Sequence, residues 1–168
     1  PQLGGNLDTN SNSIAFGDSN NDAAASGTVN RLKFGAGTDM VMYHNGTDNF
    51  IKNPNGNFKI FTGADKQSLI AVPNGAVELY HNDVKQLSTR SDGIEIHSPE
   101  GGEAMIYLTA DEGEDTNDKY RVVAQNGGDL VFQRHNGSAY SSELRLKSAG
   151  GMQLNYQGSN KLETTNTR

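Results

Sequence analysis

Histidine recurs at the tips of predicted β-hairpins, where its imidazole could bind a metal ion or an anion. Residues 44–46, 81–83 and 135–137 read His-Asn-Gly, His-Asn-Asp and His-Asn-Gly, and Tyr156 takes the place of histidine in a fourth turn. In a trimer, three copies of His44 or of His81 could meet near the axis and hold a metal. Tyr156 instead favours a packing role, in which a polar aromatic ring packs across the hairpin.

An acidic segment at residues 111–118 is a second candidate for metal binding. Its carboxylates, among them Asp111 and Asp115, are ligands that Ca²⁺ prefers. The segment lacks the alternating aspartates and the terminal glutamate of a known calcium loop. The alternative is a solvated loop that keeps the edge of a β-sheet soluble.

No residue pattern points to catalysis. The absence of cysteine excludes thiolate nucleophiles, disulfides and cysteine-ligated metals. The sequence contains neither a Gly-x-Ser-x-Gly elbow nor a phosphate-cradling glycine loop that ends in Lys-Ser or Lys-Thr. Its 20 acidic residues make carboxylate pairs unavoidable, and none stands out as a glycosidase pair. We therefore expect no enzymatic activity and no cofactor.

The elements that would carry these side chains are short strands joined by turns. Gly75–Gly93 reads as a strand, a two-residue turn and a second strand, with apolar and polar residues alternating. Shifting this segment by 75 positions places Val77 on Met152 and Leu79 on Leu154, so the hairpin is repeated near the C-terminus. No segment shows the three-and-four spacing of a helix, and the chain is predicted to be all-β. The other segments with strand signals are 14–16, 32–34, 40–44, 50–51, 58–61, 69–72, 94–96, 104–110, 120–124, 130–135 and 144–146.

The composition offers little material for a core within one chain. Only 33% of the residues are hydrophobic, and 20 are glycines. Sharing a core between identical chains is the simplest remedy. The net charge of −6 gives no basic patch for nucleic acid, and no apolar run approaches a membrane span. Because the chain starts at Pro1 without a leader, we interpret it as an internal piece of a longer polypeptide.

Several stretches resemble the tail-fibre proteins of tailed phages, especially those of marine and cyanobacterial phages. They are PQLGGNLDTN at 1–10 with IAFGD at 14–18, RLKFGAGTD at 31–39 with YHNG at 43–46, and GAVELY at 75–80 with KQLST at 85–89, echoed by NKLETT at 160–165. The acidic segment 108–120 is also similar to a fibre module in which an aromatic and a basic residue follow the acidic loop, as Tyr120 and Arg121 do.

The resemblance implies a structural virion protein without catalysis, located outside the cell in the tail fibre and linking the tail to host-surface recognition. Its expected partners are two further copies of itself, other tail and fibre proteins, and a host-surface glycan or protein. The expected fold is an all-β, elongated, intertwined homotrimeric fibre of short hairpins, similar to a β-prism or triple β-helix, with room for a small β knob. We divide the chain into a connecting segment at 1–30, a hairpin shaft module at 31–98, a β module with the acidic loop at 99–147, and the start of the next shaft repeat at 148–168.

In this interpretation the chains share an apolar interior. Its expected residues are Ile14, Phe16, Leu32, Phe34, Met40, Met42, Val77, Leu79, Ile94, Ile96, Met152 and Leu154. A glycan contact is expected within residues 99–147, where the candidates are Tyr107, Tyr120, Arg134, His135 and Tyr140. Two alternatives stay open: a subunit of an extracellular filament or adhesin, and a glycan-degrading tailspike.

Overall fold

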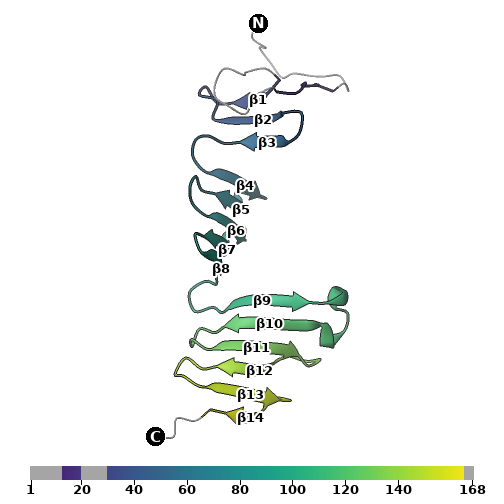
Figure 1. Ribbon diagram of the computed structural model, residues 1–168, viewed down its shortest axis with the longest axis vertical. Helices are drawn as coiled ribbons and strands as arrows, with labels where there is room; N and C mark the ends of the chain where they lie inside the picture. The colour runs from purple at the N-terminus through teal and green to yellow at the C-terminus, as the bar shows by residue number, and fades with distance from the viewer. Residues whose placement is uncertain (1–12, 20–29, 165–168) are drawn as a thin grey trace. The chain divides into compact units, whose positions relative to one another are not determined.

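The computed structural model describes residues 13–19 and 30–164, and it confirms that this part of the chain is all-β. The described residues form three antiparallel sheets, in each of which neighbouring strands follow one another along the chain (Figure 1). By their contacts, residues 1–58 and 59–168 form two separate units. Most of the expected connecting segment at 1–30 lies outside the described residues. No helix long and apolar enough to cross a membrane occurs in the described part of the chain.

The first sheet contains β1 (Leu32–Phe34), β2 (Met40–His44) and β3 (Asn49–Lys52). Cross-strand pairing aligns Leu32 with Met42 and Met42 with Ile51, and all three side chains are exposed on one face. The other face carries Val41 and Tyr43, which are buried.

The second sheet contains β4 (Phe58–Thr62), β5 (Lys66–Ala71), β6 (Val77–His81), β7 (Val84–Arg90) and β8 (Gly93–Ile96). Leu79 pairs with Leu69 on one side and with Leu87 on the other, and Leu87 pairs with Ile96. A row of apolar side chains therefore crosses four strands on one face. The next row, on the opposite face, is polar over β6–β8, because Glu78 pairs with Ser88 and Ser88 with Glu95, and it begins with the buried Ile70 of β5.

The third sheet is the largest. It contains β9 (Ala104–Thr109), β10 (Lys119–Ala124), β11 (Leu130–His135), β12 (Tyr140–Leu146), β13 (Met152–Tyr156) and β14 (Ser159–Glu163). The acidic segment joins β9 to β10 through two short 3-10 helices, Asp111–Gly113 and Thr116–Asp118. The sheet is open, and β9–β12 continue directly into β13 and β14. The region expected to form a small knob is thus part of a larger sheet.

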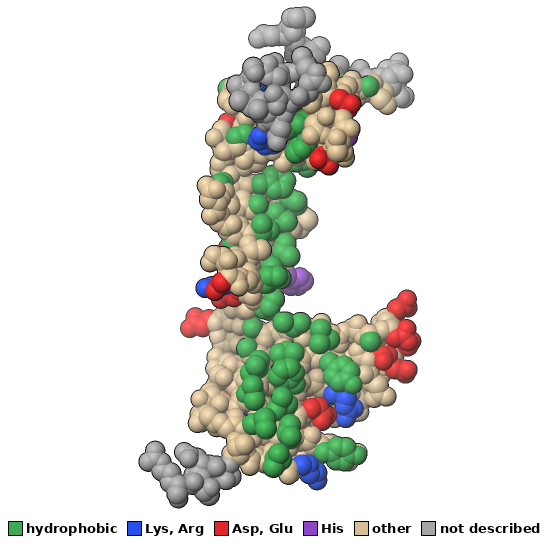
Figure 2. All heavy atoms as spheres, viewed as in Figure 1, with side chains coloured by type: hydrophobic (Ala, Val, Ile, Leu, Met, Phe, Trp, Pro, Cys, Tyr) green, Lys and Arg blue, Asp and Glu red, His purple; other side chains and the backbone are tan. Residues whose placement is uncertain are grey.

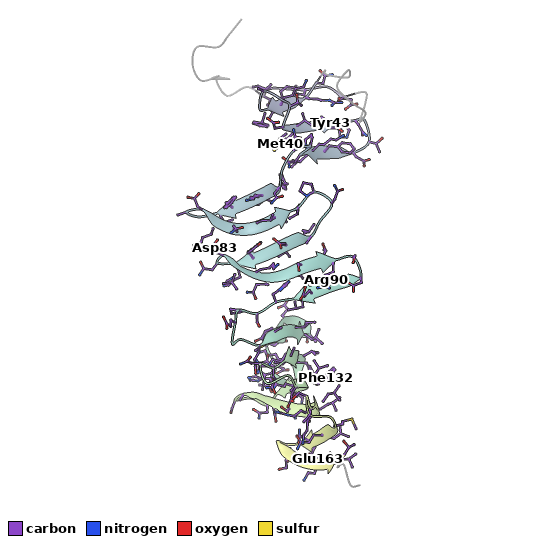
Figure 3. All side chains as sticks on the ribbon, turned by 90° about the vertical axis from the view of Figure 1, so that its left-hand side faces the viewer. Met40, Tyr43, Asp83, Arg90, Phe132 and Glu163 are labelled. Atoms are coloured by element: carbon purple, nitrogen blue, oxygen red, sulfur yellow. The ribbon has the colours of Figure 1, made fainter. Side chains whose placement is uncertain are left out.

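One face of the third sheet is apolar and exposed, and we call it the apolar face. Cross-strand pairing places one side chain from each strand in a single row: Ile106, Val122, Phe132, Leu144, Leu154 and Leu162. Figure 2 shows hydrophobic side chains gathered in a band across these strands, and Figure 3 labels Phe132 in a view at a right angle to Figure 1. Within this row, Phe132 is 40% exposed and Leu162 is 56% exposed, so these apolar side chains are accessible to solvent.

The opposite face of the third sheet is polar, and we call it the polar face. Its most buried residues are Val123 and Val131, which have no exposed surface. They lie in one cross-strand row between Met105 and Arg145, whose longer side chains flank them. The sheet is one layer thick. On its polar face the long side chains of Met105 and Arg145 cover the two valines, whereas no element covers its apolar face among the described residues.

The predicted repeat is present in the structure down to its hydrogen bonds. Leu79 pairs with Leu87 and Leu154 with Leu162, and in each hairpin the pairing shifts by one residue immediately after these pairs. The backbone N–H of Val77 donates to Oγ1 of Thr89 at 2.9 Å, and residues 152 and 164 make the same bond at 2.8 Å. Two copies of one sequence pattern thus fold into the same bulged hairpin.

The strand expected at residues 14–16 is wrong. Residues 13–19 form no strand, and the side chains of Ile14 and Phe16 are about half exposed. The segment meets β2 through the backbone N–H of Ser19, which donates to the carbonyl of His44 at 2.7 Å. Alternation over three residues predicts a strand only where a neighbouring strand supplies a ladder, and none does so for this segment among the described residues.

Candidate functional site

A row of polar and aromatic side chains crosses the polar face of the third sheet. Arg121 of β10 pairs with Tyr107 of β9 and with Gln133 of β11, and Gln133 pairs with Ser142 of β12. Nε of Arg121 donates to Oε1 of Gln133 at 2.5 Å. Nε2 of Gln133 in turn donates to Oγ of Ser142 at 3.4 Å. These bonds fix the orientation of the amide and of the guanidinium.

Aromatic rings frame this guanidinium. The centre of the Arg121 guanidinium lies 4.2 Å from the ring centroid of Tyr140 and 5.9 Å from that of Tyr107. The two tyrosine rings meet edge to face, with centroids 6.0 Å apart, and His135 meets Tyr140 in the same way at 5.1 Å. We call Tyr107, Arg121, Gln133, His135 and Tyr140 the tyrosine–arginine cluster.

Three of the five expected glycan-contact residues belong to this cluster: Tyr107, His135 and Tyr140. The other two lie on the apolar face, where Tyr120 pairs with Arg134 across β10 and β11. Nη2 of Arg134 lies 3.3 Å from Oε1 of Glu143. The structure therefore divides the expected set between the two faces of one sheet.

Sequence reasoning missed Arg121 and Gln133 as members of the site. Alternation along β10 and β11 places each of them on the same face as a buried valine, Val123 or Val131, which marks that face. Only the pairing of β9, β10 and β11 shows that they stand beside Tyr107. Strand alternation could have assigned Arg121 and Gln133 to this face, but it does not identify their neighbours on adjacent strands.

The histidines of two hairpins have a definite structural role. Nδ1 of His44 accepts a hydrogen bond from the backbone N–H of Gly46 at 3.1 Å, and Nδ1 of His135 accepts one from Gly137 at 3.2 Å. Both glycines have positive φ, 94° and 100°. The side chain of the asparagine between them accepts two further backbone N–H groups in each turn. His-Asn-Gly is therefore a self-capping turn.

His81 lies in a different turn. It pairs with Val84 across a two-residue loop in which Asn82 and Asp83 both have positive φ. This is the type I′ geometry expected from the sequence. Oδ1 of Asp83 accepts the backbone N–H of Gln67 at 2.8 Å, and Oδ2 accepts Nζ of Lys66 at 2.5 Å. The bond from Lys66 is the larger cause that lowers the pKa of Asp83.

The candidate metal ligands are not gathered into a site within this chain. Among the described residues, no three histidine or acidic side chains come together in a way that could hold a metal. His44 contacts Oδ1 of Asp18 at 2.8 Å. Asp111 and Asp115 lie in the loop of the two 3-10 helices, Asp111 with positive φ and Asp115 directly before the second helix. A site shared between chains stays a prediction.

The polar face of the second sheet has its own network. The hydroxyl of Tyr80 donates to Oε2 of Glu78 at 2.6 Å, and Nζ of Lys85 donates to Oε1 at 3.0 Å. These two bonds, the one from Tyr80 first, lower the pKa of Glu78 below its ordinary value of 4.5. The same bond to Glu78 raises the pKa of Tyr80.

Comparison of the chain with protein-family models, with curated proteins and with solved structures finds no match in any of the three.

Proposed function

We propose that this chain is a structural segment of a homotrimeric tail fibre, in which the exposed apolar faces of three copies meet around a common axis. The observation that supports the proposal is the uncovered apolar face of the third sheet. A fully buried leucine or isoleucine side chain contributes about 1.5–3 kcal/mol relative to an exposed one. The row contains six apolar side chains, of which Ile106, Phe132, Leu154 and Leu162 are exposed, and it is therefore a large unused driving force for association.

The second sheet supports the same proposal. Val77, Leu79 and Ile94 are expected interior residues, and all three are exposed on the face that carries the apolar row. In the third sheet, Met152 and Leu154 belong to the apolar face. In the first sheet, Leu32, Phe34, Met40 and Met42 share one face by pairing. Within each sheet, the expected interior residues that lie in strands thus share one face, whereas Ile14 and Phe16 lie outside the strands.

A second copy of the chain is the favoured occupant because every sheet shows the same feature. A core shared between identical chains accounts for a low hydrophobic content and for sheets one layer thick. The stretches that resemble tail fibres of tailed phages direct the proposal to a virion, where the segment would link the tail to the host-recognition end.

The native mass of the purified chain tests this proposal. Three chains of 18.0 kDa give about 54 kDa, and light scattering should return this mass over a wide concentration range. A mass that grows with concentration would indicate a filament subunit instead. A stable monomer would contradict the proposal.

A pair of neighbouring substitutions identifies the face that associates. Leu108 is 54% exposed on the apolar face, and Thr109 is exposed on the polar face one residue later. Leu108→Glu should shift the mass towards the monomer, because a carboxylate buried between chains lacks a partner. Thr109→Glu introduces the same charge and should leave the trimer intact. Equal effects of the two substitutions would show that the apolar face is not the contact.

A further inference from the structure

Arg121 differs from the other arginines of the second and third sheets in lacking a negative partner. Arg90, Arg134 and Arg145 each contact a carboxylate, Arg145 through Asp129 at 2.9 Å. No carboxylate of the described residues lies within 4.0 Å of the Arg121 guanidinium. Its contacts are an amide, a phenol, a thioether and an aromatic ring. In a chain with net charge −6, this half-buried cation is left uncompensated.

The ring beside Arg121 is accessible. Tyr107 is 57% exposed, and its hydroxyl is held by Nη1 of Arg121 at 3.4 Å and by the sulfur of Met105 at 3.3 Å. The phenol is anchored at its tip while the ring remains open to a ligand. Tyrosine serves in this way at recognition surfaces, because it offers a rigid apolar face at little cost in side-chain entropy.

From these two observations, we infer that the tyrosine–arginine cluster binds a saccharide that carries a carboxylate. The carboxylate would pair with Nη2 of Arg121, which makes no hydrogen bond to the described residues, whereas Nε and Nη1 are engaged. A C–H face of the sugar ring would lie on Tyr107. Gln133 would offer its amide to a hydroxyl group, with Ser142 beside it.

The acidic loop narrows the ligand class. Residues 111–118 directly connect β9 and β10, the strands that carry Tyr107 and Arg121. Five of these eight residues are Asp or Glu. At physiological ionic strength, electrostatic interactions between exposed charges are largely screened beyond about 8 Å. A dense polyanion such as nucleic acid would therefore be repelled, whereas a sugar with one isolated carboxylate can meet Arg121 alone.

This inference rests on the proposed function, because association through the apolar face leaves the polar face to solvent on the outside of the fibre. The site would then be present once per chain, three times at one level of a trimer. Repeated weak sites increase overall affinity by avidity without any new contact.

Binding to paired oligosaccharides tests the inference. The probes are a panel of oligosaccharides that contain uronic or sialic acids, each printed beside its carboxyl-reduced neutral counterpart. The full chain should bind at least one acidic member tenfold or more tightly than its neutral partner. Arg121→Gln should abolish that preference. Arg90→Gln removes the same charge from the second sheet and should not change binding.

Two substitutions separate the ring from its hydroxyl. Tyr107→Phe should retain most of the affinity, whereas Tyr107→Ala should lose about tenfold or more. Binding that is absent for the whole panel, equal for neutral partners, or equally weakened by Arg121→Gln and Arg90→Gln would overturn the inference. The native mass of each variant is measured in parallel. A trimer that does not bind overturns only this inference, whereas a monomer that binds acidic sugars overturns only the proposed function.

Discussion

Nδ1 of His44 lies 2.8 Å from Oδ1 of Asp18, which precedes it by 26 residues. The same nitrogen lies 3.1 Å from the backbone nitrogen of Gly46. One nitrogen atom cannot donate a proton to Asp18 and accept one from Gly46 at the same time. His135 makes the same bond to its glycine, and no carboxylate of residues 13–19 or 30–164 contacts that nitrogen. The two His-Asn-Gly turns thus differ in that Asp18 competes with Gly46 for Nδ1 of His44.

We expect Asp18→Ala to strengthen the turn at His44. Without the carboxylate, Nδ1 has lost its competing partner and is free to accept the N–H of Gly46. The amide of Gly46 should exchange with solvent more slowly, by about two- to fivefold if the gain is about 0.5–1 kcal/mol. Amide hydrogen exchange followed by NMR measures this, with Gly137 as the internal control. Faster exchange at Gly46 would show that Asp18 supports the turn.

Removing the hydroxyl of Thr89 should loosen the repeated hairpin locally. Thr89→Val deletes the acceptor of the Val77 N–H, and Thr164→Val does the same for Met152. Each bond contributes about 0.5–1.5 kcal/mol, and the two should act independently because they belong to different sheets.

Amide exchange at residues 77 and 152 checks this prediction. Each substitution should accelerate exchange only in its own copy of the hairpin. Thr62→Val deletes a hydroxyl that hydrogen-bonds to the side chain of Ser68, and it serves as the control. An equal effect of Thr62→Val at residue 77 would contradict a local role for Thr89.

The bonds to Glu78 predict a dependence of stability on pH. The folded-state pKa of Glu78 is lower than its ordinary value of 4.5. Its stabilising contribution is therefore fully present above pH 4.5 and is lost as the pH falls through the lower folded-state pKa. Tyr80→Phe removes the larger cause of this shift and should cost about 1 kcal/mol at pH 7, and less at pH 3.

Urea unfolding between pH 7 and pH 3 measures this effect. The difference in unfolding free energy between the native chain and Tyr80→Phe should shrink on acidification. Glu100→Gln in the exposed turn after β8 provides a control, because Glu100 makes no ion pair within the described residues. A difference that stays constant with pH would rule out the bond between Tyr80 and Glu78 as its source.

Gly113 in the acidic loop should not tolerate a side chain. It has φ of 75°, and a Cβ atom built there would lie 2.4 Å from Cγ2 of Thr109. Gly56 has a similar φ of 70° but no atom near its Cβ position. Gly56→Ala should therefore cost about 1 kcal/mol for backbone strain alone, and Gly113→Ala clearly more. Thermal unfolding compares the two variants, and equal losses would show that the loop yields to the added methyl group.

The class of fold and most of the turns could be predicted from the amino-acid sequence alone. Alternation over β6, carried to β13 by the repeat, marked the faces of both strands correctly, because the period of a strand depends only on the chain. The turn at Asn82-Asp83 and its relative at residues 157–158 followed from residues that tolerate positive φ. The repeat spaced by 75 positions was also visible in the sequence, and the two hairpins share the same strand pairing and the same side-chain hydrogen bond.

Which side chains contact one another depends on strand pairing, which the amino-acid sequence did not reveal. Strict alternation from Leu144 and Leu146 would place Tyr140 on the apolar face. A bulge at Glu143 shifts the register so that Ser142 pairs with Gln133, and Tyr140 consequently stands beside Arg121 on the polar face. A one-residue shift moves every following side chain to the other face of the sheet, and no local sequence pattern predicts this bulge. Alternation thus assigns faces, whereas pairing and bulges assign neighbours, and the candidate site depends on neighbours.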